Sequence, residues 1–300
     1  MTSTGPGSSA PVELLFLGGG RMGAALIGGL LAAGRPLGSV AVVERDARRR
    51  SELSGEFPGL RVEPSPVPAR TVVVCTKPGD VLDAVGAAAT VGLEQVVSIA
   101  AGVGTGAIES VVGAVPVVRA MPNTPALLGA AATAIAAGSH AGPQALDEAE
   151  ALLATVGTVV RVDEQALDAV TAVSGSGPAY VFLLAEHLAA AGADLGLPDD
   201  LAAALVRQTV LGAARMLCET GDDPQGLRAA VTSPGGTTAA AVAAFDDAGF
   251  DAMVRRAVTA AARRSAELGA AFGPDAPGSG APGPGAPETG GAAEPSGDER

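Results

Sequence analysis

A glycine-rich turn between an apolar run and a helical stretch constrains this chain more than any other feature. The run Val12–Leu17 is typical of a buried parallel strand, and residues 24–33 after the turn have the pattern of a helix. Between them, Gly18-Gly-Gly-Arg-Met-Gly23 matches G-x-G-x-x-G. In this strand–turn–helix setting the glycines let a pyrophosphate approach the backbone, so we expect a dinucleotide-binding loop. A plain glycine-rich turn is the alternative.

Further apolar runs alternate with helical stretches along the first half of the chain. Strands are expected at 40–43, 71–75, 95–99, 115–119, 131–137 and 158–162, with helices after Asp46 and over 80–89 and 144–155. Strands that alternate with helices favour a parallel, doubly wound sheet. The sequence therefore predicts an α/β domain of the Rossmann type over residues 12–165.

From about residue 166 the pattern changes to long segments rich in Ala and Leu. Helices are expected over 179–193, 199–219, 237–248 and 251–271. Several of these helices are apolar on more than one face, and such a helix needs burial on several sides. We expect an all-α dimerisation domain over residues 166–272. The N-terminus, 1–11, and the acidic Gly/Pro-rich tail, 273–300, are expected to be disordered.

Charge and hydropathy exclude several classes of function. The net charge of −13 argues against a nucleic-acid partner. Mean hydropathy is +0.35, but Arg207 and Arg215 interrupt the best candidate for a membrane span, residues 201–218. The N-terminus has no basic, apolar signal sequence, so we expect a cytoplasmic protein without a membrane partner. The two cysteines lie far apart and have no metal-ligand spacing, so no metal site is expected.

The residues after the second expected strand bear on the choice of cofactor. Glu44 lies about 20 residues beyond the last glycine of the turn, where an acid can bind the ribose 2′-hydroxyl of NADH. Arg45 and the arginines at 48–50 could instead hold the 2′-phosphate of NADPH. Those arginines could also form a solvated helix face. The sequence favours NADPH, and NADH remains possible.

Three more loops follow expected strands, and ligands bind at the carboxyl ends of strands in open α/β sheets. In the loop 76–78, Lys77 could contact the ribose of the cofactor. The small residues at 100–102 leave room for a nicotinamide ring. Asn123 offers an amide from a loop that two prolines stiffen.

A second distinctive segment, Thr232-Ser-Pro-Gly-Gly-Thr-Thr238, stands directly before an Ala-rich helix. The start of a helix leaves backbone N–H groups unpaired and carries the positive end of the dipole, so it can hold a small anion. Gly235 and Gly236 have no side chains to keep a ligand away from these groups. We expect a carboxylate to dock here beside a threonine hydroxyl. A Pro-Gly turn that merely starts a helix is the alternative.

Four motifs together resemble pyrroline-5-carboxylate reductases. They are the glycine turn at 18–23, Met-Pro-Asn-Thr-Pro at 121–125, Val-Ser-Gly-Ser-Gly-Pro-Ala-Tyr at 173–180 and Val-Thr-Ser-Pro-Gly-Gly-Thr-Thr at 231–238. Their order and spacing agree with the family over about 14–268, and the last motif is the family's own signature. The resemblance implies reduction of L-1-pyrroline-5-carboxylate to L-proline with NAD(P)H, the last step of proline biosynthesis. It also implies self-association as a dimer or decamer.

The resemblance also assigns roles to residues. It makes Thr238 the catalytic residue, which hydrogen-bonds the substrate ring nitrogen, while backbone amides around it hold the carboxylate. The expected substrate-binding residues are Ser176, Ser233, Gly235, Gly236, Thr237 and Thr238. The expected cofactor-binding residues are Gly18, Gly20, Arg21, Met22, Gly23, Glu44, Arg45, Thr76, Lys77, Pro78, Ala100, Ala101, Gly102 and Asn123.

The scarcity of bases in the second half agrees with this chemistry. Dehydrogenation of an alcohol needs a base, usually Lys or His, but residues 166–272 contain no lysine and a single histidine, His187. A cyclic imine can bring its own proton, so the enzyme chiefly positions the reactants. Two alternatives remain. One is a hydroxyacid dehydrogenase of similar architecture, which carries a catalytic lysine in its helical domain. The other is a non-catalytic NADPH-binding regulatory protein.

Overall fold

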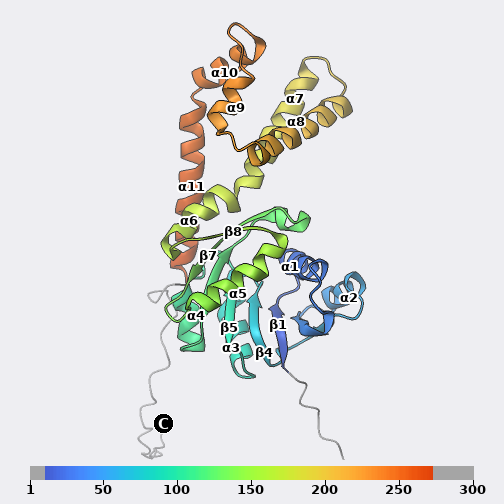
Figure 1. The fold of residues 1–300 in the computed structure, drawn as a ribbon, viewed down its shortest axis with the longest axis vertical. Helices are drawn as coiled ribbons and strands as arrows, with labels where there is room; N and C mark the ends of the chain where they lie inside the picture. The colour runs from blue at the N-terminus through green and yellow to red at the C-terminus, as the bar shows by residue number, and fades with distance from the viewer. Residues whose placement is uncertain (1–10, 273–300) are drawn as a thin grey trace, which may run out of the picture.

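The computed structural model describes residues 11–272, which form a sheet flanked by helices and a helical arm that projects from it (Figure 1). The tail 273–300 and, apart from Pro11, the N-terminal segment 1–11 lie outside the described residues. The sheet ends at Arg161 and the first helix of the arm begins at Leu167. The expected boundary between residues 165 and 166 falls in this connection and stays a prediction.

An eight-stranded sheet, in the order β3-β2-β1-β4-β5-β6-β7-β8, forms the first half. The strands are β1 (Val12–Leu17), β2 (Val40–Val43), β3 (Arg61–Glu63), β4 (Ala69–Val74), β5 (Gln95–Ser98), β6 (Val117–Met121), β7 (Ala131–Ala137) and β8 (Gly157–Arg161). The expectation of a parallel sheet holds for every neighbouring pair except β6 and β7, which are antiparallel. A parallel return needs a long crossover, and residues 122–130 between these strands supply only a 3-10 helix, Thr124–Leu128.

Helices cover both faces of the sheet, which confirms the doubly wound arrangement. They are α1 (Arg21–Ala32), α2 (Ala47–Glu56), α3 (Val81–Ala89), α4 (Thr105–Val112) and α5 (Pro143–Leu153). In β1, Leu14 and Phe16 belong to the apolar cluster on one face, and Leu15 and Leu17 to the cluster on the other. Because successive side chains of a strand point to opposite faces, a strand buried on both sides is apolar throughout.

The helical arm contains the elements after residue 166. They are α6 (Leu167–Val170), a π-helical turn (Thr171–Gly175), α7 (Gly177–Asp194), α8 (Asp199–Glu219), α9 (Pro224–Ala230), α10 (Thr237–Asp247) and α11 (Phe250–Ala270). Figure 1 shows α7 and α8 as one pair, α9 and α10 at the end of the arm away from the sheet, and α11 returning toward the sheet. The arm therefore begins and ends beside the sheet.

The arm exposes much apolar surface in the single chain. The side chains of Phe182 and Leu183 on α7 and Leu205 on α8 are 66%, 54% and 51% exposed. The helical segments Glu164–Asp194 and Asp199–Glu219 are also long and apolar enough to cross a membrane, and only 11% and 6% of their most apolar windows are buried. Apolar surface of this extent marks a site for another molecule.

The end of α11 packs directly on a loop of the sheet. A Cβ atom added to Gly269 would lie 3.1 Å from the carbonyl oxygen of Gly102, and one added to Gly102 would lie 3.2 Å from the backbone nitrogen of Gly269. Gly102 also has a φ of +79°, which favours glycine. Higher on the same helix, Ser265 Oγ donates to Asp168 Oδ1 of α6 over 2.6 Å. The glycine contact ties the end of α11 to the loop after β5, and the hydrogen bond of Ser265 ties α11 to α6 within the arm.

Candidate active site

The glycine turn lies where β1 ends and α1 begins, as the sequence predicts. Gly18 has a φ of +98°, and a Cβ atom on Gly23 would lie 2.5 Å from the carbonyl oxygen of Gly18. A Cβ atom on Gly20, in contrast, would meet no atom within 4 Å. Gly18 and Gly23 thus allow the tight turn, and Gly20 leaves open space in front of it. Gly20 caps α1 without a side-chain hydrogen bond, so the first N–H groups of the helix remain available to an anion.

A first hollow of about 420 Å³ opens beside the turn, at the carboxyl ends of β1, β2 and β4. It contains six of the expected cofactor residues: Gly18, Gly20, Glu44, Arg45, Thr76 and Lys77. It also contains residues that sequence reasoning missed: Pro64, Ser65 and Pro66 after β3, and Asp80, Asp83, Ala84 and Ala87 at the start of α3 and along it.

A second hollow of about 330 Å³ continues from the first, and the two share Cys75 and Thr76. It contains the expected residues Met22, Thr76, Pro78, Ala100, Ala101 and Asn123. Residues that were not expected here are Cys75, Ile99, Met121, Pro122, Thr124 and Gly175. Two connected hollows beside a glycine turn match the elongated shape of a dinucleotide.

The residues shared by the two hollows fit a polar ligand. Thr76 Oγ1 is buried and has no hydrogen-bond partner in the described part of the chain. A buried hydroxyl of this kind normally has a partner, which a bound cofactor could supply. Burial raises the pKa of the neighbouring Cys75 thiol, so the thiol stays neutral and adds no charge to the hollows.

The π-helical turn forms one wall of the second hollow. The turn meets β6 at Gly175, where an added Cβ atom would lie 2.6 Å from Cε, the flexible end of the Met121 side chain. Asn123 Nδ2 donates to the carbonyl oxygen of Ser174 over 3.0 Å, while its Oδ1 accepts from the N–H of Ala132 over 3.0 Å. The amide that we expected to face the cofactor therefore holds the wall together at both ends, and a direct cofactor contact stays a prediction.

Two other residues bear on this wall. The hydroxyl of Tyr180 on α7 donates to the carbonyl oxygen of Ala172 in the π-helical turn over 2.9 Å. Ser176, an expected substrate residue, directly follows Gly175 of the second hollow and is half-buried. The structure thus places Ser176 near the expected cofactor residues.

Three expected cofactor residues border neither hollow. Arg21 is exposed at the first position of α1, and Gly23 is buried beneath the turn. Gly102 is covered by the end of α11. Gly23 and Gly102 instead shape the loops whose neighbouring residues line the hollows.

The segment 233–238 forms a turn that leads into α10. Gly236 N–H donates to the carbonyl oxygen of Ser233 over 3.0 Å, and Gly235 has a φ of +71°. Proline followed by glycine at the two central positions is the sequence that a type II turn requires. A Cβ atom on Gly236 would lie 2.5 Å from Ser233 Oγ and 3.1 Å from the carbonyl oxygen of Ser233, so a side chain there would crowd the turn and force Ser233 Oγ to move.

The first turn of α10 has unused hydrogen-bonding groups. Gly236 caps the helix without a side-chain hydrogen bond, which leaves the N–H groups of Thr237 and Thr238 free. Across the described residues, no partner is found for the hydroxyls of Ser233, Thr237 or Thr238. Free donors at a helix start beside free hydroxyls are what a small carboxylate ligand needs.

The two groups of expected site residues lie in different parts of the chain. The hollows lie at the sheet, whereas Figure 1 shows α10 at the far end of the arm. Of the expected substrate residues, Ser176 alone lies beside the second hollow. The structure of one chain does not bring 233–238 to the cofactor loops.

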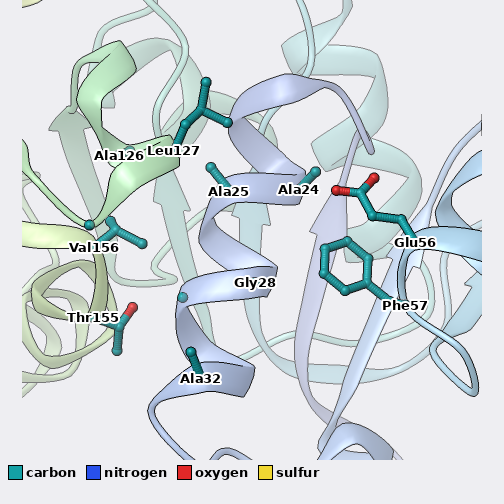
Figure 2. Close-up of a pocket in the computed structure, with 12 residues that line it drawn as sticks. Ala24, Ala25, Gly28, Ala32, Glu56, Phe57, Ala126, Leu127, Thr155 and Val156 are labelled. Carbon is teal, nitrogen blue, oxygen red and sulfur yellow. The ribbon is translucent and has the colours of Figure 1, made fainter.

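A third hollow, the α1 groove, has a different character (Figure 2). Figure 2 shows Leu127, Thr155 and Val156 on one side of α1 and Glu56 and Phe57 on the other. The groove has a volume of about 400 Å³, and Glu56 is the one charged residue in its lining. It contains no expected site residue and no group suited to hydride transfer.

The sheet, the glycine turn and the connected hollows define an NAD(P)H-dependent oxidoreductase with an appended helical dimerisation domain. Comparison with known families supports each half. Residues 164–268 match the model for pyrroline-5-carboxylate reductase dimerisation, and residues 13–102 match the model for NADP oxidoreductase, coenzyme F420-dependent. The chain belongs to the pyrroline-5-carboxylate reductase family.

Individual relatives are similar over almost their whole length. A pyrroline-5-carboxylate reductase from Pseudomonas aeruginosa is 42% identical over 269 residues, which cover 87% of this chain and 98% of the relative. One from Mycobacterium tuberculosis is 44% identical over 284 residues, with 85% and 96% covered.

Solved structures of pyrroline-5-carboxylate reductases have the same fold as this chain. A pyrroline-5-carboxylate reductase from Coxiella burnetii has a TM-score of 0.79 and 34% identity, and covers 86% of this chain and 98% of its own. The Plasmodium falciparum enzyme, solved with NADP bound, has a TM-score of 0.75 and 27% identity, with 86% and 98% covered.

Proposed function

We propose that this chain reduces L-1-pyrroline-5-carboxylate to L-proline with NADPH or NADH, in the last step of proline biosynthesis. The observation that carries the proposal is the free helix start at 233–238, in a chain that also has two connected hollows beside its glycine turn. A substrate with one carboxylate and one ring nitrogen matches the free N–H groups and the hydroxyl of Thr238. A non-catalytic NADPH-binding protein would need only the hollow.

The proposed mechanism relies on positioning. The free N–H groups of Thr237 and Thr238 hold the carboxylate, because that of Gly236 is already bonded to Ser233, and the Thr238 hydroxyl hydrogen-bonds the ring nitrogen. A bound nicotinamide would supply the hydride. Reduction of the protonated C=N bond would leave the electron pair of that bond on nitrogen, which keeps its proton. Thr238 therefore orients the ring and need not donate a proton.

The residues of the two hollows suit the parts of a dinucleotide. The open space before Gly20, next to the uncapped start of α1, would take the pyrophosphate. Glu44, Arg45 and Lys77 of the first hollow would hold the adenosine ribose, and Ala100 and Ala101 of the second would leave room for the nicotinamide. The buried hydroxyl of Thr76, which both hollows share, would gain a hydrogen-bond partner.

We further propose that each active site is shared between two chains. The segment 233–238 lies at the end of the arm, away from the cofactor loops of its own chain. The exposed apolar side chains of α7 and α8 give the arm a surface for a second copy, which can bring its own 233–238 segment to the first chain's hollows. Dimers of this kind can assemble further into a decamer. The net charge of −13 supports an enzyme without a nucleic-acid partner, and Arg207 and Arg215, which interrupt the apolar run 201–218, support a cytoplasmic enzyme without a membrane partner.

The activity itself is the first prediction. Purified protein with NADPH or NADH is expected to lose cofactor absorbance only when pyrroline-5-carboxylate is added, and to form proline in equal amount. Turnover of a 2-hydroxy or 3-hydroxy acid, with none of the imine, would instead establish the rival dehydrogenase. Cofactor binding without turnover of either substrate class would favour the regulatory protein.

Shared active sites predict that two defective variants restore each other. Gly20→Val removes the cofactor site of a chain, and Thr238→Ala weakens its substrate site. In a mixed dimer one active site carries both defects and the other carries none. Co-expression of differently tagged chains at equal levels, with random pairing, is therefore expected to recover about a quarter of the parent activity.

The control for this experiment is the same two variants purified separately and mixed only in the assay, before subunits exchange. If each site forms within one chain, the co-expressed sample stays at the mean of the two separate variants. That result would contradict the shared site and leave the catalytic assignment of Thr238 untouched.

A further inference from the structure

The charges around the first hollow bear on which dinucleotide this chain prefers, an inference that rests on the proposed function. The hollow is lined by three acidic residues, Glu44, Asp80 and Asp83, and by two basic residues, Arg45 and Lys77. NADPH differs from NADH by a phosphate on the adenosine ribose, and that phosphate carries a charge of about −2 at neutral pH. Negatively charged side chains therefore outnumber positively charged ones in the lining, and negative charge repels the phosphate.

Glu44 is held in place at the end of β2. Its Oε2 accepts from the N–H of Gly19 over 3.0 Å, and its Oε1 accepts from the N–H of Asp46 over 3.0 Å. Each carboxylate oxygen has a second lone pair, so Glu44 can still accept a hydrogen bond from a ribose hydroxyl. A 2′-phosphate at the same place would meet a fixed negative charge.

The arginines that could offset this charge are engaged elsewhere. Arg49 Nε donates to the carbonyl oxygen of Gly19 over 2.7 Å, on the turn itself. Arg50 Nη1 donates to the carbonyl oxygens of Glu44 and Arg45 over 3.0 and 2.8 Å. Arg48 is 89% exposed and pairs with Glu52 on the outer side of α2. None of these three arginines lines the hollow.

Arg45 is the arginine that lines the hollow, and it is paired with an acid of the same lining. Its Nη2 lies 2.8 Å from Asp80 Oδ1, and both side chains are well exposed, at 72% and 44%. An exposed pair of this kind is weak, so Arg45 can turn to a phosphate. It would then leave Asp80 unpaired within the hollow.

We propose that Glu44 makes this chain prefer NADH, with NADPH accepted more weakly through Arg45. Glu44 acts by accepting a hydrogen bond from the 2′-hydroxyl and by repelling the 2′-phosphate. Asp80 reinforces the preference because it holds the one arginine of the lining. Specificity here arises from a repulsive group as much as from an attractive one.

Direct binding measurements test the proposal. Dissociation constants of NADH and NADPH are measured by cofactor fluorescence, without substrate, on the parent protein, Glu44→Gln and Asp80→Asn. The parent is expected to bind NADH more tightly. Glu44→Gln keeps the shape but removes the charge, and is expected to lower the ratio Kd(NADPH)/Kd(NADH) about tenfold. Asp80→Asn frees Arg45 and should lower the same ratio about threefold.

Glu52→Gln is the matched control, because it removes an acid of α2 that pairs with Arg48 and Arg49 outside the hollow. It should leave the ratio unchanged. A parent protein that binds NADPH more tightly, or a ratio that stays within twofold in both hollow variants, would overturn the proposal. If Glu44→Gln disturbs the turn and no longer binds either cofactor, the ratio measured for Asp80→Asn tests the proposal on its own. Tight, selective binding without turnover of pyrroline-5-carboxylate would count against the proposed function alone.

Discussion

Gly20→Val is expected to abolish cofactor binding and turnover while the protein keeps its fold. A Cβ atom at Gly20 meets no atom within 4 Å, and the backbone there has an ordinary φ of −65°, so the chain itself accepts a side chain. The added branched side chain instead fills the space that the pyrophosphate needs. We expect the dissociation constants of NADH and NADPH to rise by more than about a hundredfold, because steric exclusion at the phosphates costs several kcal/mol.

Gly55→Val provides the matched control for this variant. Gly55 lies on α2, is exposed and also has open space at its Cβ position, but it borders none of the hollows described above. Cofactor titration and thermal unfolding on both variants separate the two effects. A Gly20→Val protein that unfolds like the parent and binds cofactor normally would show that the glycine turn has no role in binding.

Thr238→Ala is expected to lower kcat/KM by about one to two powers of ten. The hydroxyl is free in the single chain, and a hydrogen bond to a charged ring nitrogen is worth about 1.5–3 kcal/mol. Turnover should persist, because the iminium form of the substrate arrives already protonated. Cofactor affinity should change little, because Thr238 lies on α10 and the glycine turn lies at the sheet.

Two further substitutions sharpen the test of Thr238. Thr238→Val keeps the shape and removes the hydroxyl, so its kcat/KM should fall as far as that of Thr238→Ala. Thr232→Val is the control, because the Thr232 hydroxyl is bonded to the carbonyl oxygen of Arg228 within its own segment. If Thr238→Val equals the parent across the pH range, the hydroxyl has no role. A complete loss of activity in a folded Thr238 variant would make Thr238 a proton donor.

Much of the fold could be predicted from local sequence pattern. The apolar run of β1 and the glycines after it fix a strand, a turn and a helix, and α8 has the expected bounds because charged and proline residues mark its ends. The edge strand β3 was missed because three half-buried residues give no periodic signal. The helix α4 follows a Gly-rich loop and is short, so its pattern is weak.

The site was predictable where a motif has its own chemistry and not where distant elements meet. The glycine turn and 233–238 are each recognisable from local residue types. The walls formed by Ser65 after β3 and by Gly175 of the π-helical turn arise only when the chain is folded. The same holds for the arginines of α2, because local sequence cannot show that Arg49 turns back to the carbonyl oxygen of Gly19.

The exposed apolar face of α7 and α8 has a consequence for how the enzyme is made. A newly synthesised chain can complete its sheet alone, but the arm has to wait for an encounter with another chain, so the final step of maturation is second order in protein concentration. Until that encounter the waiting species exposes Phe182 and its neighbours, and aggregation, which also depends on collisions between chains, competes with assembly. The yield of active enzyme after dilution from denaturant is thus limited by collision of chains, even when the cofactor-binding half refolds rapidly.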